Sequence, residues 1–155
     1  MRPFRAGDMG LIASRQAALY DEGYDWGSKL EALILEITAN FLRDFRPDRE
    51  QCWVAERDGL MLGSVFLVRE SEDTARLRLL YVEPQARGMG VGAALVRECT
   101  DFARGAGYRR IALWTHSVLE SARRLYAAEG YRIVATEMQD KFGKPEQSEH
   151  WLLEL

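Results

Sequence analysis

Apolar side chains recur at helical spacing through the first third of the chain. One such stretch, Leu11–Leu19, follows Asp8, a residue type that often caps a helix N-terminus, and continues to about Glu22. A second stretch opens with Ser28–Glu31, which fits the capping-box pattern, and ends before Pro47. The apolar residues of this second stretch fall on one helical face: Leu30, Leu33, Ile34, Ile37 and Phe41. The pattern therefore predicts two amphipathic helices.

The middle of the chain shows the pattern of antiparallel strands. Asp58-Gly59, a strong signal for a tight hairpin turn, separates the apolar segments 52–55 and 62–68. The segment 75–82 begins with alternating apolar and polar residues and then becomes apolar throughout, which predicts a strand whose end is buried. A further short strand is expected near residues 2–4.

The last third of the chain alternates between helical and strand patterns. An apolar stripe over residues 91–106 predicts a helix, and the short apolar run 111–114 predicts a buried strand after it. With the preceding strand they form a βαβ unit, whose two strands lie parallel. Residues 120–129 predict another helix, and 131–135 and 151–155 predict two final strands. Together these elements predict an α/β (α+β) fold with a mixed sheet.

Composition supports one ordered domain over residues 1–155, because 47% of the residues are apolar and 29% are charged. The net charge of −3 and the scattered basic residues argue against a nucleic-acid partner. No apolar run approaches the roughly 20 residues that span a bilayer, and the first residues lack a signal peptide. We therefore expect a cytoplasmic protein without a membrane partner. Cys52 and Cys99 have no ligand-like spacing, so neither a disulfide nor a metal site is expected.

The segment Gln85–Gly92 carries glycines between a predicted buried strand and the start of a predicted helix. Gly88, Gly90 and Gly92 let the backbone come close to a bound group, and the free N–H groups of the first helical turn point toward it. The helix dipole favours negative charge at this end, and Arg87 adds a cation beside it. The segment therefore predicts an anion-binding turn.

Three alternative roles for these glycines have less support. A dinucleotide-binding Rossmann unit needs an acidic residue roughly 20 positions after the glycines, and residues 108–119 contain none. A P-loop needs Lys followed by Ser or Thr, which Val91–Ala93 does not supply. Glycines that only pack the helix against the strand would need no more than two at such a corner.

The pattern Gln85-x-x-Gly88-x-Gly90 on a strand-to-helix turn resembles the pyrophosphate motif of the GNAT acetyltransferase superfamily. The flanks are similar as well: Leu80–Pro84 matches the strand that enters the turn, and Leu125–Tyr131 matches a later helix that ends in Gly-Tyr. The likeness covers about residues 50 to 155. It is closest to the bacterial acetyltransferase domain fused behind MarR-type DNA-binding domains, although no such DNA-binding segment is expected in this chain.

This resemblance implies the GNAT fold, with a mixed central sheet of six to seven strands flanked by about four helices. It implies an N-acetyltransferase, monomeric or homodimeric, that moves an acetyl group from acetyl-CoA to a primary amine of a small molecule or protein by direct attack. The alternative is a sensor of the same fold that binds acyl-CoA without turnover. The implied acetyl-CoA site consists of Leu80, Tyr81, Val82, Gln85, Arg87, Gly88, Met89, Gly90, Val91 and Gly92.

The resemblance also implies that the strands ending at Val82 and Trp114 splay apart to admit the pantetheine arm. Tyr126 matches the tyrosine that protonates the departing thiolate in many members, and its alternative role is packing on the sheet. A cofactor contact made by Asn in many relatives is replaced here by Leu119. His116, placed in a loop just after the strand, is the candidate general base by its ordinary pKa, with simple solvation as its alternative.

The acceptor amine is expected between the first two helices, where the family forms its acceptor wall. Aromatic and acidic residues gather there: Tyr20, Glu22, Tyr24, Asp25 and Trp26. Such a wall suits an ammonium substrate through charge and cation–π contact, with Glu22 and Asp25 as alternative bases. The same aromatic residues would also serve to dock one helix on the other.

Overall fold

Seven strands form one sheet through the middle of the protein, in the order β1-β2-β3-β4-β5-β7-β6. The computed structural model describes all residues, 1–155. The strands are β1 (Arg2–Pro3), β2 (Gln51–Arg57), β3 (Leu60–Arg69), β4 (Thr74–Val82), β5 (Arg110–His116), β6 (Arg132–Gln139) and β7 (Glu146–Glu154). All neighbours are antiparallel except β4 and β5, which are parallel. The mixed sheet and the predicted βαβ unit are therefore confirmed.

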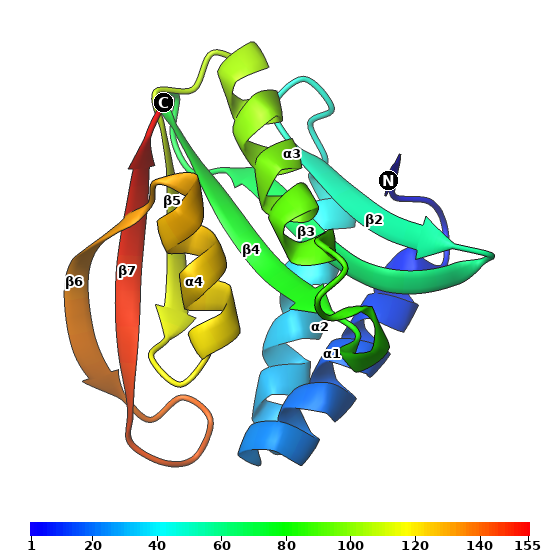
Figure 1. Ribbon diagram of the computed structural model, residues 1–155, viewed down its shortest axis with the longest axis vertical. Coiled ribbons are helices and arrows are strands. Elements are labelled where there is room, and N and C mark those ends of the chain that lie inside the picture. Colours follow the sequence, from blue (N-terminus) through cyan, green and yellow to red (C-terminus); the bar gives the residue numbers. More distant parts are fainter.

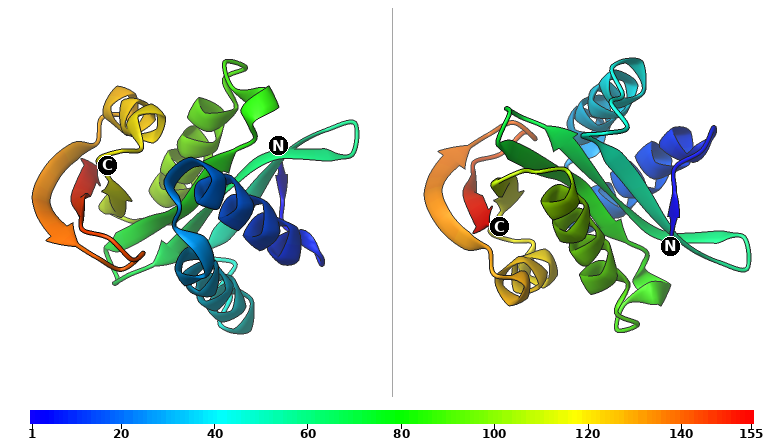
Figure 2. Two further views of the ribbon diagram at one scale, coloured as in Figure 1. Left: turned by 90° about the horizontal axis from the view of Figure 1, so that it is seen from below. Right: turned by 90° about the horizontal axis from the view of Figure 1, so that it is seen from above.

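Helices cover both faces of the sheet. The α-helices are α1 (Asp8–Tyr24), α2 (Gly27–Arg43), α3 (Val91–Gly105) and α4 (Glu120–Glu129), and a short 3-10 turn, η1, covers Pro84–Ala86. Helices α3 and α4 lie on the near face in Figure 1, whereas α1 and α2 lie behind the sheet. Figure 2 shows the same two layers end-on, with β6 curling away at the edge.

The predicted N-caps of the first two helices are wrong. Helix α1 is preceded by Gly7, and the carboxylate of Asp8 turns back to accept the Arg5 amide at 2.7 Å and the Arg2 guanidinium at 2.8 Å. Helix α2 begins at Gly27, so Ser28 lies inside the first turn and caps nothing. The Gly27 amide is instead bound by Asp21 at 3.0 Å, a contact between helices that sequence spacing does not reveal.

The core lies in two layers because the sheet is covered on both faces. On the α3 and α4 side, the stripe of α3 buries Leu95 and Cys99 against Leu67, Leu77 and Ile111. On the α1 and α2 side, the buried apolar residues include Met9, Ile12, Phe41, Cys52 and Phe66. Strand β4, in the middle of the sheet, is therefore packed between the two layers.

Strands β4 and β5 pair only at their N-terminal ends. Thr74, Ala75 and Arg76 pair with residues 110–112, and no register continues beyond the pair of Arg76 with Ala112. The predicted splay is therefore confirmed, and Figure 1 shows the two strands diverging toward their C-terminal ends. A gap thus opens through the sheet between Leu77–Val82 and Leu113–His116.

Gly63 permits the close approach of β3 to the end of β4. A Cβ atom at this position would lie 2.5 Å from the Tyr81 carbonyl oxygen and 3.3 Å from the Val82 Cα atom. Both atoms belong to the backbone, so neither can move aside without shifting the strand.

Gly63→Ala is therefore expected to lower the free energy of unfolding by about 1–3 kcal/mol, measured by urea denaturation. Gly10→Ala is the matched control, because nothing lies within 4 Å of its Cβ position and it sits in helix α1. That change is expected to leave stability equal or to raise it by up to about 1 kcal/mol. Equal stabilities for the two variants would contradict the close packing at Gly63.

Candidate functional site

The turn after β4 presents backbone N–H groups that no protein atom accepts. Arg87 N donates to Pro84 O at 3.3 Å, and Met89 N donates to Ala86 O at 3.3 Å, so these two amides are occupied. The free amides of the turn and of the first turn of α3 are those of Gly88, Gly90, Val91, Gly92 and Ala93. No side chain caps this helix. The predicted anion-binding turn therefore has its donors available.

The glycines of this turn have two different roles. Gly88 and Gly90 adopt left-handed φ angles of 80° and 77°, and nothing lies within 4 Å of a Cβ atom at either position. They shape the turn and leave its outer side open. At Gly92 a Cβ atom would lie 2.6 Å from Leu125 Cδ1, so this glycine packs α3 against α4 while its amide stays free.

The side chains of the turn differ in exposure. Gln85, Arg87 and Met89 are exposed, and Arg87 has no carboxylate partner. Val91 is half-buried and packs at the edge of the core. Arg87 therefore lies beside the free amides as an uncompensated cation.

Strand β4 bulges immediately before the turn, a feature that the sequence pattern did not lead us to predict. Leu79 has a φ of 54°, and the register slips so that Leu79 and Leu80 lie opposite Val65 alone. The consecutive leucines, where alternation breaks off, were the available signal. The Leu80 carbonyl points to α1 and accepts the Tyr20 hydroxyl at 3.2 Å.

The predicted acetyl-CoA residues at the end of β4 face different surroundings. The Tyr81 side chain packs among Met9, Ile12 and Phe66, so only its backbone is near the gap. Val82 packs against the α3 side and is half-buried. The backbone of Leu80–Val82 has no β5 partner, because pairing with β5 ends at Arg76.

An ion pair fixes the end of β4 to helix α1, and no sequence motif predicts it. Arg15 donates two hydrogen bonds to Glu83 Oε1, at 2.7 and 3.1 Å, and Nε also lies 3.1 Å from Oε2. The Glu83 side chain is only 6% exposed. A paired and shielded carboxylate of this kind holds the start of the glycine turn in place.

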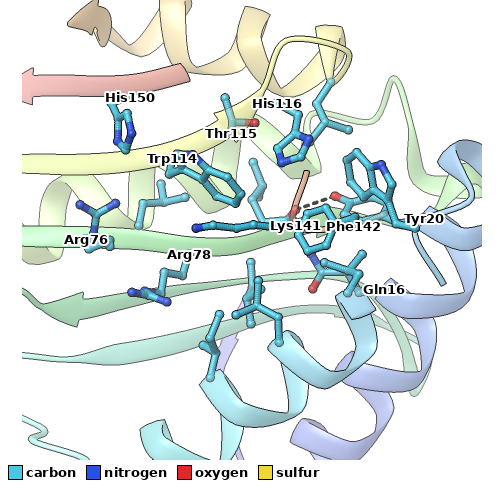
Figure 3. Close-up of a pocket in the computed structure, with 18 of the residues that line it drawn as sticks. Gln16, Tyr20, Arg76, Arg78, Trp114, Thr115, His116, Lys141, Phe142 and His150 are labelled. Carbon is cyan, nitrogen blue, oxygen red and sulfur yellow. Dashed lines mark hydrogen bonds between the residues drawn. The ribbon is translucent and has the colours of Figure 1, made fainter. Parts of the chain in front are cut away.

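A cleft of about 430 Å³ opens at the gap between β4 and β5. Figure 3 shows side chains from the α1–α2 layer, from both splayed strands and from the β6–β7 loop around it. Tyr20 and His116 lie at one end, and Arg76 and Arg78 lie at the other (Figure 3). The Trp26 ring packs against both Tyr20 and His116. Tyr126 of helix α4, on the opposite side of the sheet, lines the same cleft because no strand pairing separates the two sides.

Tyr126 is buried, with its ring 5.8 Å from Tyr131 and 6.1 Å from Trp151. Its hydroxyl has no hydrogen-bond partner in the protein, yet it is not sealed off as the hydroxyls of Tyr81 and Tyr131 are. Burial raises the pKa of Tyr126, so the phenol stays protonated. The ring packs in the core and the residue also lines the cleft, so packing is observed while the catalytic role of Tyr126 stays a prediction.

His116 is neither in a loop nor solvated, which corrects the prediction. It is the last residue of β5, and its side chain is 2% exposed between the rings of Trp26, Trp114 and Phe142. β5 pairs with β7 as far as the pair of His116 with Ser148. The strand therefore continues to His116, and this residue is buried.

Both ring nitrogens of His116 are engaged. Nδ1 lies 3.2 Å from Glu146 Oε2, and Nε2 lies 3.2 Å from the Gln139 amide nitrogen. The Gln139 oxygen accepts the Lys141 amide at 2.7 Å, so its nitrogen donates to His116. His116 is thus a neutral ring that donates from Nδ1 and accepts at Nε2, which leaves no free nitrogen for a general base.

The structure brings only some residues of the predicted acceptor wall to the cleft, and their acceptor role stays a prediction. Tyr20 and Trp26 line the cleft, and Tyr24 stacks on Trp26 with centroids 4.8 Å apart. Glu22 and Asp25 are exposed and lie outside the cleft lining, so the acidic part of the prediction is wrong. Glu22 follows Tyr20 by two residues, about 200° around the helix, and therefore faces solvent. The Trp26 indole N–H donates to Glu146 at 2.8 Å, which ties the wall to His116.

Comparison with protein families matches residues 15–131 to the model described as the Acetyltransferase (GNAT) family. The match begins well before residue 50, where the motif likeness was expected to start. A probable N-acetyltransferase family 8 member 5 from Mus musculus is 35% identical over 61% of this chain and 44% of that protein. The chain spans about half the length of the curated relatives it matches.

Two solved structures share the fold along almost the whole chain. A ribosomal-protein-alanine N-acetyltransferase from Brucella melitensis has a TM-score of 0.79 at 21% identity, covering 99% of this chain and 98% of that one. A putative acetyltransferase from Salmonella typhimurium, solved with acetyl-CoA, has a TM-score of 0.74 at 21% identity, covering 99% and 92%. The predicted sheet with its flanking helices is thus confirmed as this fold. None of the helices combines the length and the apolar character needed to cross a membrane.

The buried His116 makes stability depend on pH. Burial lowers its pKa below the ordinary value of 6.5, and Glu146 only partly offsets this. The unfolded chain therefore binds a proton at a pH where the folded protein does not, so the free energy of unfolding falls as pH decreases below about 6.5. Urea denaturation between pH 7 and pH 5 measures this slope. His116→Asn, which keeps a donor for Glu146, is expected to flatten it, and an unchanged slope would exclude His116 as its source.

Proposed function

The chain belongs to the acetyltransferase (GNAT) family, and we propose that it transfers an acetyl group from acetyl-CoA to a primary amine. The acceptor is a small molecule or a protein, and attack is direct. The observation that carries this proposal is the row of free amides at Gly88 and Gly90–Ala93, at the end of a strand that has parted from its neighbour.

The residues of this region fit acetyl-CoA. The free amides, with Arg87 beside them, would hold the pyrophosphate, because backbone N–H groups and the helix dipole both favour an anion there. The backbone groups of Leu80–Val82 that face the gap, where β5 offers no partner, would hydrogen-bond the pantetheine arm. Leu79 and Leu80, the two residues of the bulge, line the cleft, and the thioester would lie beside them.

Tyr126 would serve the leaving group in this reaction. The amine nitrogen forms a bond to the thioester carbon, the C–S bond breaks, and the departing thiolate accepts a hydrogen bond from the Tyr126 hydroxyl. Because burial raises the pKa of Tyr126, the phenol is protonated and acts chiefly by hydrogen bonding as charge develops on sulfur. His116 holds the aromatic wall in place, and the ammonium proton of the acceptor leaves to water in the open cleft.

Further features of the proposal rest on the sequence. We further propose that the enzyme is bacterial and cytoplasmic and is close to the acetyltransferase domains fused behind MarR-type modules; only this last likeness draws on the flanks Leu80–Pro84 and Leu125–Tyr131. The relatives include vertebrate as well as bacterial proteins. Mass photometry or light scattering would decide between the monomer and the homodimer.

The activity is tested by calorimetric titration with acetyl-CoA, followed by detection of free CoA thiol with a panel of primary amines. Binding with amine-dependent thiol release is the expected result. Tight binding without release for any amine would favour the acyl-CoA sensor. Absence of binding would overturn the proposal.

Gly90→Asp places a carboxylate at the free amides and is expected to abolish acetyl-CoA binding through charge repulsion. Gly90→Asn is the matched control, because it has the same shape without the charge and tolerates the left-handed φ of 77° similarly. It is expected to weaken binding far less. Calorimetry measures both affinities, and circular dichroism checks that both variants fold. Equal affinities would rule out the phosphate role of this turn.

Tyr126→Phe removes the hydroxyl that faces the cleft and keeps the ring that packs in the core. We expect kcat to fall by no more than about 10²–10⁴-fold, the range of acid–base groups, with little change in acetyl-CoA affinity. Steady-state thiol release and calorimetry separate the two effects. Wild-type turnover in this variant would reduce Tyr126 to a packing residue.

A further inference from the structure

One end of the cleft is basic. Arg76, Arg78 and Lys141 all line it, and Figure 3 shows their charged groups at the end away from Tyr20. This local charge is opposite to the net charge of the chain, which is −3. The cleft lining thus contains these three cations and neither Glu22 nor Asp25, the acidic residues that the sequence had led us to expect there.

The two acidic residues of the cleft lining are already paired. Glu70 Oε1 accepts two hydrogen bonds from Arg76, at 2.6 and 2.8 Å. Glu137 Oε1 lies 3.1 Å from His150 Nε2. The lining thus holds three cationic side chains, Arg76, Arg78 and Lys141, against two carboxylates, and neither Arg78 nor Lys141 forms an ion pair with one of them.

Arg78 is the cation left without any partner. Its side chain is half-buried in β4, and its guanidinium makes no ion pair and no hydrogen bond within the protein, unlike neighbouring Arg76. Burial, with a smaller effect of Arg76, lowers its pKa. A guanidinium removed from water in this way gains from an oxyanion that its planar fork can bind.

From its position, Arg78 would bind the acceptor and would not reach the diphosphate of acetyl-CoA. It directly precedes the bulge at Leu79, whereas the glycine turn begins only after Val82. At about 3.3 Å per strand residue, Arg78 lies roughly 13 Å before Val82 along the strand. Lys141, from the β6–β7 loop, approaches from across the cleft, with Nζ 4.8 Å from the centre of the Trp114 ring.

We propose that the acceptor amine carries a carboxylate or phosphate group, which Arg78 binds while Lys141 adds positive charge. The rings of Trp114 and Phe142 contact the apolar part of this molecule. This specificity rests on the proposed acetyl transfer, because it places the amine of the same molecule at the bulge in β4. Arg78 is a substrate-binding residue that selects the class of amine.

Matched amine pairs test the proposal by steady-state thiol release. The pairs are phenylalanine with phenylalaninamide, 4-aminobutanoate with 4-aminobutanamide, and phosphoethanolamine with ethanolamine. The anionic member of at least one pair is expected to have a kcat/KM about 10- to 100-fold higher, the range for a hydrogen bond to a charged group. The first two pairs report on a carboxylate and the third on a phosphate.

Substitution of Arg78 identifies the residue responsible. Arg78→Met is expected to raise KM for the preferred anionic amine at least about tenfold, without changing its neutral partner or the acetyl-CoA affinity. Arg78→Lys should restore part of the preference, since charge returns without the planar fork. Arg57→Met removes the same charge at the exposed end of β2, outside the cleft, and is expected to match wild type. Equal preference in wild type and Arg78→Met would overturn the proposal.

A binding measurement separates this proposal from the proposed transfer. Calorimetry with 3-phenylpropanoate, which has no amine, and with 3-phenylpropanamide needs no turnover. Stronger binding of the acid, lost in Arg78→Met, supports the anion site even if no amine is acetylated. Equal binding of acid and amide, together with transfer to neutral amines only, would overturn the anion site and leave acetyl transfer standing.

Discussion

The parting of β4 from β5 is the constraint on which the site depends. Two parallel strands that paired along their full length would bury the backbone of Leu80–Val82 in ladder hydrogen bonds. Here the ladder ends at Arg76 and Ala112, and the two strands diverge beyond it. Backbone donors and acceptors in the interior of a protein require partners, so an opening of this kind is retained where a ligand or water supplies them.

Several contacts keep the opening from closing. The bulge at Leu79 bends β4 on one side, and the ion pair of Arg15 with Glu83 fixes the end of the strand to α1. On the other side, β5 pairs with β7 down to His116. Where β4 and β5 diverge, β4 is thus paired with β3 and β5 is paired with β7.

A buried polar network supports the wall of the cleft. Glu146 accepts the Trp26 indole N–H and lies against His116, whose second nitrogen accepts from Gln139. These groups join the start of α2 with β5, β6 and β7 around one aromatic cluster. Because each polar atom is satisfied, the network rigidifies the cleft at little cost in desolvation. Rigid walls of this kind set the distance between an anion at Arg78 and an amine at the bulge.

The sequence by itself determined the elements and the turn. The apolar stripe of α3, the Asp58-Gly59 hairpin and the helix ending at Gly130 are local patterns, and the structure contains each of them. The glycine turn was also readable, since φ angles that favour glycine are a property of the backbone itself. The N-caps of α1 and α2 were not, because Asp8 and Gly27 are held by contacts from outside their own helical turns.

The charge of the cleft was decided only by the tertiary structure. Glu22 and Asp25 are close in sequence to the aromatic wall but face solvent, whereas Arg78 and Lys141 come from distant segments and meet in the cleft. His116 was expected in a loop but is buried in β5, because pairing with β7 continues to this residue. Local periodicity tells which face of an element is apolar. Which charged groups are left without partners depends on how separate elements pack, and that is settled by the whole fold.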